Sequence, residues 1–520
     1  MNPSTTTTRT NPRPDPAPGT EPASGGGPAT GRRALSVLLA LAASAALAAP
    51  VATAAPAGKA APRPPGGTST PIVWGPCKGD PPMPDPGPQA ECGTVRVPVD
   101  WSKPSGPGTD IAVARQQATD PAKRIGVLLV NPGGPGGSGV DSAMYADNPI
   151  DGYSAELRRR FDVVGFDPRG IGRSGSAVCD EAAFAKVPSR PRNAAEWEKV
   201  RTLNAQAIQS CRRQTGPLAA GMDSNSVVRD MDAIRAALGE RKISYLGHSY
   251  GTFLGERYSR LFPENLRTMV LDSAMDPAPP GAEQYLTDTA VTASESLEKL
   301  SSRCAADPAC TAPGLPKGKK LTAVIDELFV RADAGTLRRP GPNGPTRAKV
   351  TPDELTGLLN GLAAGGYPDQ ATEQLGALYG GKGEVRFHGD GPVNPAIPLV
   401  LCRDSDYRIR DWAEYRAIRQ RVAAAAPYVR YNDQSLSFAL SCQGSPLPVE
   451  PRPARAAGSL PPVLVVNAVY DLPTPLAGAR RMADAIPTAT LHEVDTVGHV
   501  LYLMPAVKPV IDHHLLHRSR

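Results

Sequence analysis

The stretch Gly247-His248-Ser249-Tyr250-Gly251 follows a short apolar run at residues 243–246 and precedes a stretch of helical character at 252–261. A G-x-S-x-G pentapeptide between a strand and a helix is typical of a nucleophile elbow, a tight turn that lifts a serine hydroxyl above the edge of a parallel sheet. A side chain at either glycine would collide with the neighbouring strand or helix in so sharp a turn. Ser249 is therefore the candidate nucleophile. Because the chain has 51 glycines, the pattern needs support from the rest of the sequence.

Short runs of apolar and β-branched residues alternate with helical stretches along the chain. Two ranges are expected to form an early hairpin and six to form buried strands: 93–99 and 110–116, then 126–131, 161–166, 243–246, 269–271, 463–467 and 491–494. Apolar residues at helical spacing between 227 and 238, followed by Gly239, predict a helix. This alternation predicts an α/β fold, a mainly parallel sheet covered by helices on both faces. Ligands of such sheets bind at the carboxyl ends of the strands.

One long interval, residues 277–455, interrupts the alternation because its pattern is chiefly helical. Its amphipathic stretches lie near 282–303, 319–334, 352–363 and 411–425. Thr351-Pro352-Asp353-Glu354 predicts a helix start, with a capping threonine, a proline in the first turn and a glutamate at the third position. We interpret the interval as a lid inserted between two parts of a sheet domain, residues 71–276 and 456–520. A separate helical domain is the alternative.

A serine nucleophile needs a base and an orienting carboxylate, and in this kind of fold they follow in the order Asp or Glu, then His. Asp471 lies four residues beyond the strand expected to end at Asn467, and His499 lies five beyond the strand expected to end at Val494. Both positions are loops at carboxyl strand ends. We therefore predict Ser249, Asp471 and His499 as the catalytic residues.

The other candidates for base and acid have poorer positions. Of the seven histidines, one neighbours Ser249, one lies in the helical interval, one lies within a strand and three lie in a terminal helix or tail: His248, His388, His492, and His513, His514 and His517. For the acid, Asp272 and Asp276 follow the preceding strand and stay possible, with Asp276 the main competitor. Asp495 is too close to His499 in sequence to be the usual partner.

The glycine-rich run at residues 131–139, Asn-Pro-Gly-Gly-Pro-Gly-Gly-Ser-Gly, directly follows an expected strand. Such a run exposes backbone N–H groups, and acyl transfer needs donors of this kind for the developing oxyanion. A phosphate-binding loop is the alternative, but the run lacks the lysine and the Ser/Thr that such a loop requires. The N–H groups of Gly134 and Tyr250 are the expected oxyanion donors.

The N-terminus has the order of a secretory signal. Residues 1–31 are rich in Thr, Pro, Gly and Ser, and they precede Arg32-Arg33, an apolar segment at 34–49 and the expected cleavage site Ala52-Thr53-Ala54. A membrane anchor is the alternative, but this alanine-rich segment is short for a span of roughly 20 residues. We expect a signal peptide at 1–54, a disordered linker at 55–70 and a secreted protein without a stable membrane anchor. The paired arginines raise the twin-arginine route, whose motif the flanking residues match only in part.

Charge and cysteine content indicate which classes of partner and cofactor the protein is expected to bind. The net charge of the 520 residues is only +6 with 21% charged residues, which does not favour a nucleic-acid binder. Eight cysteines in an exported chain indicate disulfides, and the most local pairing would be Cys77–Cys92, Cys179–Cys211, Cys304–Cys310 and Cys402–Cys442. No Cys-x-x-Cys pair or clustered Cys/His spacing occurs in the sequence. We therefore expect neither a metal nor another cofactor.

Five motifs occur together in order: residues 132–139, Asp167-Pro168-Arg169-Gly170-Ile171-Gly172-Arg173-Ser174, residues 247–252, Asp471 with Thr474-Pro475, and Gly498-His499. Together they resemble the secreted bacterial tripeptidyl aminopeptidases, α/β-hydrolase serine peptidases related to the prolyl aminopeptidases. The resemblance covers roughly residues 72–515. It implies an exopeptidase that binds a free peptide N-terminus under the lid and releases a short fragment, expected to be a tripeptide. The family's catalytic roles carry onto Ser249, Asp471 and His499, and its oxyanion loop onto 132–139.

An aminopeptidase must also pair the substrate's ammonium group with carboxylates, because an unpaired buried charge is costly. Asp404, Asp406, Glu283 and Asp288 are candidates for this role. A secreted carboxylesterase with the same three catalytic residues is the nearest alternative function, since only the pocket would differ. A non-catalytic binding protein on the same scaffold is a third.

Overall fold

The computed structural model describes residues 6–9, 71–79, 83–278, 281–387 and 396–517. Its contacts divide the chain into two units, one made of Met1–Thr10 and Ser69–Arg520 and the other of Asn11–Thr68. All described residues belong to the first unit. Apart from residues 6–9, the expected signal peptide and linker lie outside the described residues, and both stay predictions. Within the described ranges, no helix is both long enough and apolar enough to cross a membrane.

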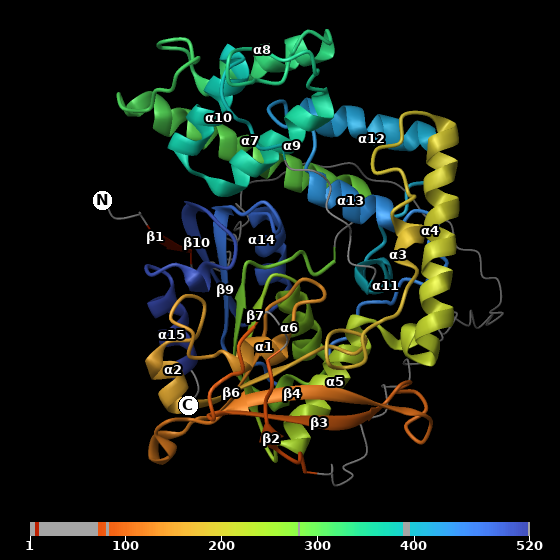
Figure 1. Ribbon diagram of the computed structural model, residues 1–520. Coiled ribbons are helices and arrows are strands. Elements are labelled where there is room, and N and C mark those ends of the chain that lie inside the picture. The colour runs from red at the N-terminus through yellow and green to blue at the C-terminus, as the bar shows by residue number, and fades with distance from the viewer. Residues whose placement is uncertain (1–5, 10–70, 80–82, 279–280, 388–395, 518–520) are drawn as a thin grey trace, which may run out of the picture. The chain divides into compact units, whose positions relative to one another are not determined.

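A ten-stranded sheet runs through the described unit in the order β1-β10-β9-β8-β7-β5-β6-β4-β3-β2 (Figure 1). The strands have these bounds: β1 Thr6–Arg9, β2 Gly75–Pro76, β3 Ala90–Pro98, β4 Gly108–Gln116, β5 Gly126–Asn131, β6 Phe161–Phe166, β7 Ile243–His248, β8 Leu266–Asp272, β9 Val463–Tyr470 and β10 Ala489–Val497. Strands β5 to β10 pair with one another in parallel, whereas the pairs made by β1, β2, β3 and β4 are antiparallel. The predicted mainly parallel sheet is confirmed.

All eight strands expected from the sequence are present, and several are longer than the apolar runs that predicted them. β8 begins at Leu266 rather than 269 and β10 begins at Ala489 rather than 491, because strand pairing continues through Thr268 and Thr490. Polar residues can occupy such ladder positions, since pairing uses backbone groups. Apolar runs therefore found the strands but underestimated their length.

Helices cover both faces of the sheet. Their bounds are α1 Gly139–Met144, α2 Ala155–Arg160, α3 Glu181–Phe184, α4 Ala194–Thr215, α5 Ser224–Ala237, α6 Tyr250–Leu261, α14 Leu476–Ala485 and α15 Lys508–His517. Successive residues of a strand point to opposite faces, and the buried strand β5 shows the result. Val127 and Leu129 belong to a core shared with α5, α6 and α14, whereas Leu128 and Val130 belong to a core shared with α2 and α15.

Between β8 and β9 the structure is helical, with α7 Ala282–Ala306, α8 Leu321–Asp333, α9 Pro352–Gly365, α10 Pro368–Gly380, α11 Ala396–Asp404, α12 Trp412–Ala425 and α13 Asp433–Ser441. These helices share a hydrophobic core of their own, to which α4 contributes Trp197 and the loop after β9 contributes Leu472. The expected capping box of α9 is present, with Thr351 and Glu354 bonded to each other's backbone N–H. Helix α7 contacts β9 and α9 contacts β10. Our interpretation of residues 277–455 as a lid stays a prediction.

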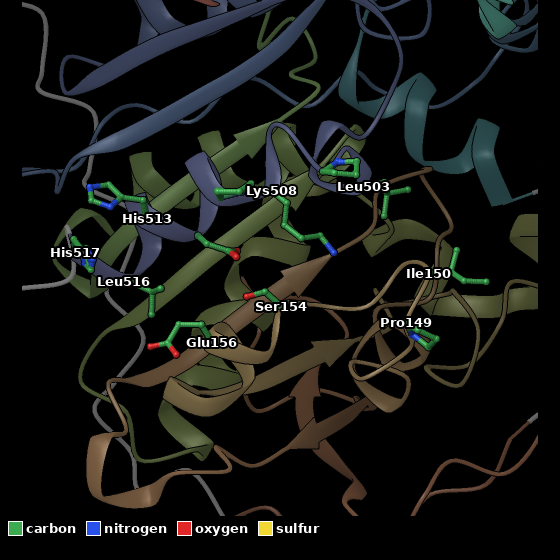
Figure 2. Close-up of a pocket in the computed structure, with 12 residues that line it drawn as sticks. Pro149, Ile150, Ser154, Glu156, Leu503, Lys508, His513, Leu516 and His517 are labelled. Atoms are coloured by element: carbon green, nitrogen blue, oxygen red, sulfur yellow. The ribbon is translucent and has the colours of Figure 1, made fainter. Parts of the chain in front are cut away.

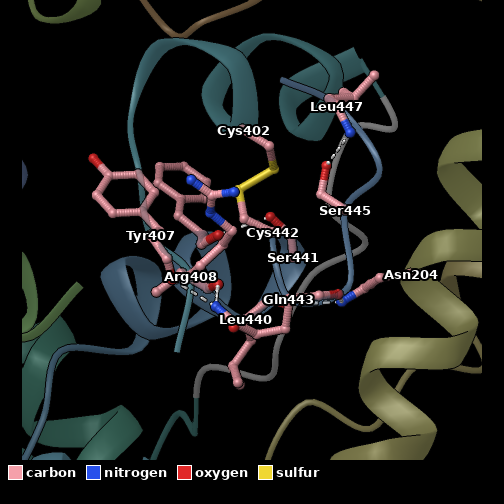
Figure 3. Close-up of a disulfide and its surroundings, with 12 residues drawn as sticks. Asn204, Cys402, Tyr407, Arg408, Leu440, Ser441, Cys442, Gln443, Ser445 and Leu447 are labelled. Carbon is pink, nitrogen blue, oxygen red and sulfur yellow. Dashed lines mark hydrogen bonds between the residues drawn. A yellow bond between two sulfur atoms is a disulfide. The ribbon is translucent and has the colours of Figure 1, made fainter. Parts of the chain in front are cut away.

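Four disulfides join the cysteine pairs that sequence proximity indicated: Cys77–Cys92, Cys179–Cys211, Cys304–Cys310 and Cys402–Cys442. The last one links α11 to the end of α13 (Figure 3). Beside it, the Gln443 side chain donates to the Tyr407 carbonyl and accepts from the Ile409 N–H. The disulfide and this amide therefore hold the segment after α11 against α13.

Candidate active site

Ser249 stands in the turn between β7 and α6, with φ 54° and ψ −124°. A left-handed φ is uncommon for a residue other than glycine and occurs often at functional sites. Steric contacts require glycine at both flanking positions. A Cβ on Gly247 would lie 2.6 Å from the Gly251 carbonyl oxygen, and one on Gly251 would lie 2.7 Å from the Asn131 carbonyl oxygen. The turn is thus the tight strand-to-helix turn that the pentapeptide predicted.

Asp471 and His499 lie together at the carboxyl ends of β9 and β10. His499 Nδ1 is 2.9 Å from Asp471 Oδ1 and 3.0 Å from Oδ2. Asp471 is fully buried and also accepts a bond from the Thr474 N–H, 3.0 Å, whereas 28% of the His499 side chain is exposed. With the proton on Nδ1 facing Asp471, the Nε2 atom has a lone pair for accepting a proton.

The surroundings of His499 favour its protonated form. Burial lowers its pKa, but the hydrogen bond and charge of Asp471, together with the charge of Asp272, outweigh burial and raise the pKa of His499 above its usual value. A base with a raised pKa holds the proton that it takes from a nucleophile more firmly. The Asp471–His499 pair therefore has the electrostatics of a general base.

The competing acids and histidines have other partners. Asp272 lies 2.9 Å from His248 Nδ1, and Asp276 forms an ion pair with Arg481 at 2.7 Å. His492 is buried in β10, where burial lowers its pKa. The three C-terminal histidines lie on α15. His388 lies outside the described residues.

The glycine-rich loop after β5 packs directly on the elbow. A Cβ on Gly133 would lie 2.8 Å from the Ser249 Cβ and 3.0 Å from the Tyr250 nitrogen, so only glycine allows this approach. The Gly133 N–H donates to Asn131 Oδ1 at 3.0 Å, and Pro135 has no N–H. Between these two residues, Gly134 supplies the next N–H, which is the expected donor beside that of Tyr250.

Asp167 holds this loop in place, and the sequence analysis did not assign it that role. It is fully buried after β6 and accepts bonds from Ser138 Oγ (2.7 Å), the Val140 N–H (3.1 Å) and the Arg173 N–H (2.8 Å). Burial raises the pKa of Asp167, although these bonds oppose the rise. The Asp-Pro-Arg-Gly motif is thus linked to the end of the glycine-rich loop. A signal for this role was present, because the two motifs follow neighbouring strands.

The four carboxylates considered for a substrate amine lie in different environments. Asp404 is buried and accepts bonds from Tyr250 Oη (2.6 Å), Ser224 Oγ (2.6 Å) and the Ser224 N–H (3.1 Å). The other three form ion pairs: Asp406 with Arg408, Glu283 with Arg421 and Asp288 with Arg481. Asp404 therefore supports the elbow from α11 through the Tyr250 side chain.

Asp288 borders a small cavity beside the loop that carries Asp471. Tyr285, Tyr407, Thr474 and Arg481 line it as well, and its volume is about 30 Å³. That space suits one or two water molecules rather than an amino-acid side chain. A larger cavity lies between α15 and the loop before α2, lined by residues such as Ile150, Leu503 and Lys508 (Figure 2). Ser249, Asp471 and His499 are not among the residues that line either cavity.

Comparison with known proteins gives two family-model matches, which leave residues 323–425 of the helical segment between them. A family model described as alpha/beta hydrolase fold matches residues 126–322, and one described as TAP-like protein matches residues 426–519. The tripeptidyl aminopeptidase of Streptomyces lividans is 30% identical over 434 residues, 78% of this chain and 77% of that protein. The serine protease Hip1 of Mycobacterium tuberculosis is 29% identical over 441 residues, 80% and 83% of the two chains. A carboxylesterase B of the same species is 32% identical over 408 residues, 74% and 76%.

The first family model covers the glycine-rich loop and the elbow, and the second covers Asp471 and His499. The relatives extend over about three quarters of this chain and of their own lengths. The chain therefore belongs to the family of α/β hydrolases that includes the tripeptidyl aminopeptidases, and it is a serine hydrolase.

Proposed function

We propose that this hydrolase is a secreted exopeptidase that releases tripeptides from free peptide N-termini through an acyl-enzyme on Ser249. The observation that carries the proposal is the buried Asp471 bonded to His499 at 2.9 Å, in a chain that is 30% identical to a tripeptidyl aminopeptidase. The positive φ of Ser249 in the turn between β7 and α6 supports the proposal further.

In the proposed mechanism, Ser249 Oγ attacks the substrate carbonyl while His499 Nε2 takes its proton. Asp471 keeps the proton on Nδ1 and stabilises the imidazolium. The N–H groups of Gly134 and Tyr250 donate to the oxyanion of the tetrahedral intermediate, each worth about 10²–10³ in rate. His499 then gives its proton to the leaving amine, and water releases the acyl group by the same steps.

Recognition of a free amine requires a carboxylate near the acyl site. Among the four candidates, Asp288 borders the same cavity as Thr474, whose N–H donates to Asp471, so we propose Asp288 for this role. Because that cavity of about 30 Å³ has room only for water, this role also requires the cavity to widen when substrate binds. Its present partner Arg481 also binds Asp276 and would keep a partner when Asp288 pairs with substrate. Asp288→Asn should raise KM for free-amine peptides, whereas Glu283→Gln should leave KM unchanged.

The 32% identity to carboxylesterase B supports an esterase as the alternative function. Three substrates distinguish a peptidase from an esterase. They are a tripeptide anilide with a free amine, the same anilide with a blocked amine, and a short acyl ester. The proposed function predicts cleavage of the first at a rate far above the other two. Equal rates for free and blocked anilides would exclude an aminopeptidase, and a clear preference for the ester would favour the esterase.

Export is proposed through cleavage of residues 1–54, with Arg32-Arg33 indicating the twin-arginine route. The four disulfides support an oxidising compartment. N-terminal sequencing of protein collected from the medium should begin at Ala55. A secreted protein that starts at Met1 would contradict this proposal.

A further inference from the structure

The turn after His499 is bound to the end of β8 rather than to its own strand. Asp272 is fully buried there, and its Oδ1 accepts a bond from the Leu501 N–H while Oδ2 accepts one from the Tyr502 N–H, both at 2.9 Å. The same Oδ2 lies 2.9 Å from His248 Nδ1. One carboxylate thus joins the residue before Ser249 to the segment just after His499.

Ser273 adds a second link at the same place. Its hydroxyl oxygen accepts a bond from the Val500 N–H at 2.8 Å. In the other direction, the Ser249 N–H donates to the Asp272 carbonyl at 3.0 Å. Nucleophile turn, β8 end and histidine turn therefore form one hydrogen-bonded unit.

The backbone at this junction is strained. Ser249, Ser273 and Val500 all have positive φ, of 54°, 58° and 58°. For the β-branched Val500 this region is especially unfavourable, and such residues persist only where their surroundings hold them. The N–H groups of Val500, Leu501 and Tyr502 are held by Ser273 and Asp272, which supplies the required restraint. Without it, the turn would relax and move His499.

We infer that Asp272, with Ser273, is a positioning residue that sets the approach of His499 to Ser249. The inference rests on the proposed catalytic triad. Asp272 also acts on His499 electrostatically, since its charge and that of Asp471 both raise the pKa of the imidazole. The titratable groups that face this junction come from each of its elements: His248 from β7, Asp272 from β8, Asp471 from the loop after β9, Tyr502 from the turn after His499, and His499 itself.

The test measures how fast a fluorophosphonate probe labels the full-length protein at several pH values. This rate reports the reactivity of Ser249 without depending on the peptide that the enzyme prefers. Asp272→Asn keeps the shape but cannot accept both backbone bonds with two oxygens. We expect labelling to slow about 10–100-fold, the scale of a small misplacement, and the acid limb of the pH profile to move to lower pH.

The matched control is Asp232→Asn, which also changes a buried carboxylate. Asp232 is bonded to Arg235, Tyr258 and Asn265. It should lower thermal stability without moving the acid limb. Labelling of Asp272→Asn within threefold of wild type would overturn the inference. The inference would also be overturned if Asp272→Asn and Asp232→Asn slowed labelling to the same extent and neither moved the acid limb.

Ser273→Ala provides a second variant in case Asp272→Asn does not fold. It removes the acceptor of the Val500 N–H and leaves the buried charge intact, so labelling should slow about 3–10-fold. Adding Val500→Gly should restore part of this loss, because glycine adopts the left-handed region without strain. No loss in Ser273→Ala, or no restoration by glycine, would overturn the inference. Failure of the peptidase proposal is distinguishable, because it would show as uncleaved peptide anilides with labelling intact.

Discussion

The loops at the carboxyl ends of the sheet and the helical segment 277–455 hold their charged side chains differently. At these strand ends, Asp167, Asp272 and Asp471 are fully buried, and each accepts bonds from backbone N–H groups. In the helical segment, apart from the buried Asp404, ion pairs such as Asp333–Arg430 and Asp406–Arg408 reach solvent, with 31–62% of each side chain exposed. The first arrangement fixes geometry to fractions of an ångström, which catalysis needs. The second leaves the charged groups in contact with solvent, which screens their attraction.

The largest effect that tests this difference between the two regions is expected for Asp471→Asn. The variant keeps the size of the side chain but favours the wrong tautomer of His499, so kcat should fall by about 10⁴-fold. Thermal stability should change little by comparison. Steady-state kinetics on the best substrate would measure the fall, with Asp495→Asn as the exposed control on the neighbouring strand. A loss below tenfold would show that Asp471 is not the orienting acid.

The next largest effect is expected on stability, at the buried ion pair Arg169–Asp230, with distances of 2.5 and 2.7 Å. Asp230→Asn leaves Arg169 buried without a counter-charge, so the free energy of unfolding should fall by about 3–5 kcal/mol. Urea denaturation at neutral pH would measure it. The double variant Arg169→Met with Asp230→Leu should recover much of the loss. A loss under 1 kcal/mol would mean that buried charges in these loops are no more restrictive than surface ones.

The strands and the candidate triad could be predicted because their signals are local. All six residues of β5 are buried, so its apolar run is continuous. Asp471 and His499 lie only four and five residues beyond the apolar runs that predicted β9 and β10. Helix α4 lacks that signal, since its buried side includes Asn204, Ala207 and Ser210. Helix α13 likewise buries Ser435 and Ser441. Small and polar residues on a buried face hide the helical period that a sequence pattern depends on.

The supporting carboxylates could not be predicted because their partners are distant in sequence. Arg169 meets Asp230 across 61 positions, and Leu501 meets Asp272 across 229. In the sequence Asp272 is an acid after a strand, which also fits a catalytic role. Only the folded arrangement shows that its oxygens are occupied by the turn after His499. Support of this kind depends on tertiary contacts, which no local pattern encodes.

The pH dependence of activity and of stability tests the buried strand-end groups in the wild-type protein, without any substitution. Because the pKa of His499 is raised in the folded protein, the acid limb of kcat/KM should lie above the ordinary histidine value of about 6.5. The contribution of His499 to stability changes with pH in the opposite direction to activity. Protonated His499 stabilises the fold fully below its unfolded pKa, and this contribution is lost as pH rises through the folded pKa. Rate profiles and urea denaturation across this range should therefore show rising activity while this contribution to stability falls. An acid limb below 6 would contradict the raised pKa.

The smallest effect is expected in the helical segment, at Asp333–Arg430. This pair is bidentate, at 2.7 and 2.8 Å, yet half of the Asp333 side chain is exposed. Asp333→Asn should lower the free energy of unfolding by less than about 1 kcal/mol, because solvent screens exposed pairs and ordering two side chains opposes the gain. The difference should shrink further in high salt, and kcat/KM should equal that of the wild type. Urea denaturation at low and high salt would measure it. A loss near that of Asp230→Asn would show that the helices depend on their charges as the sheet loops do, and the contrast between the two regions would disappear.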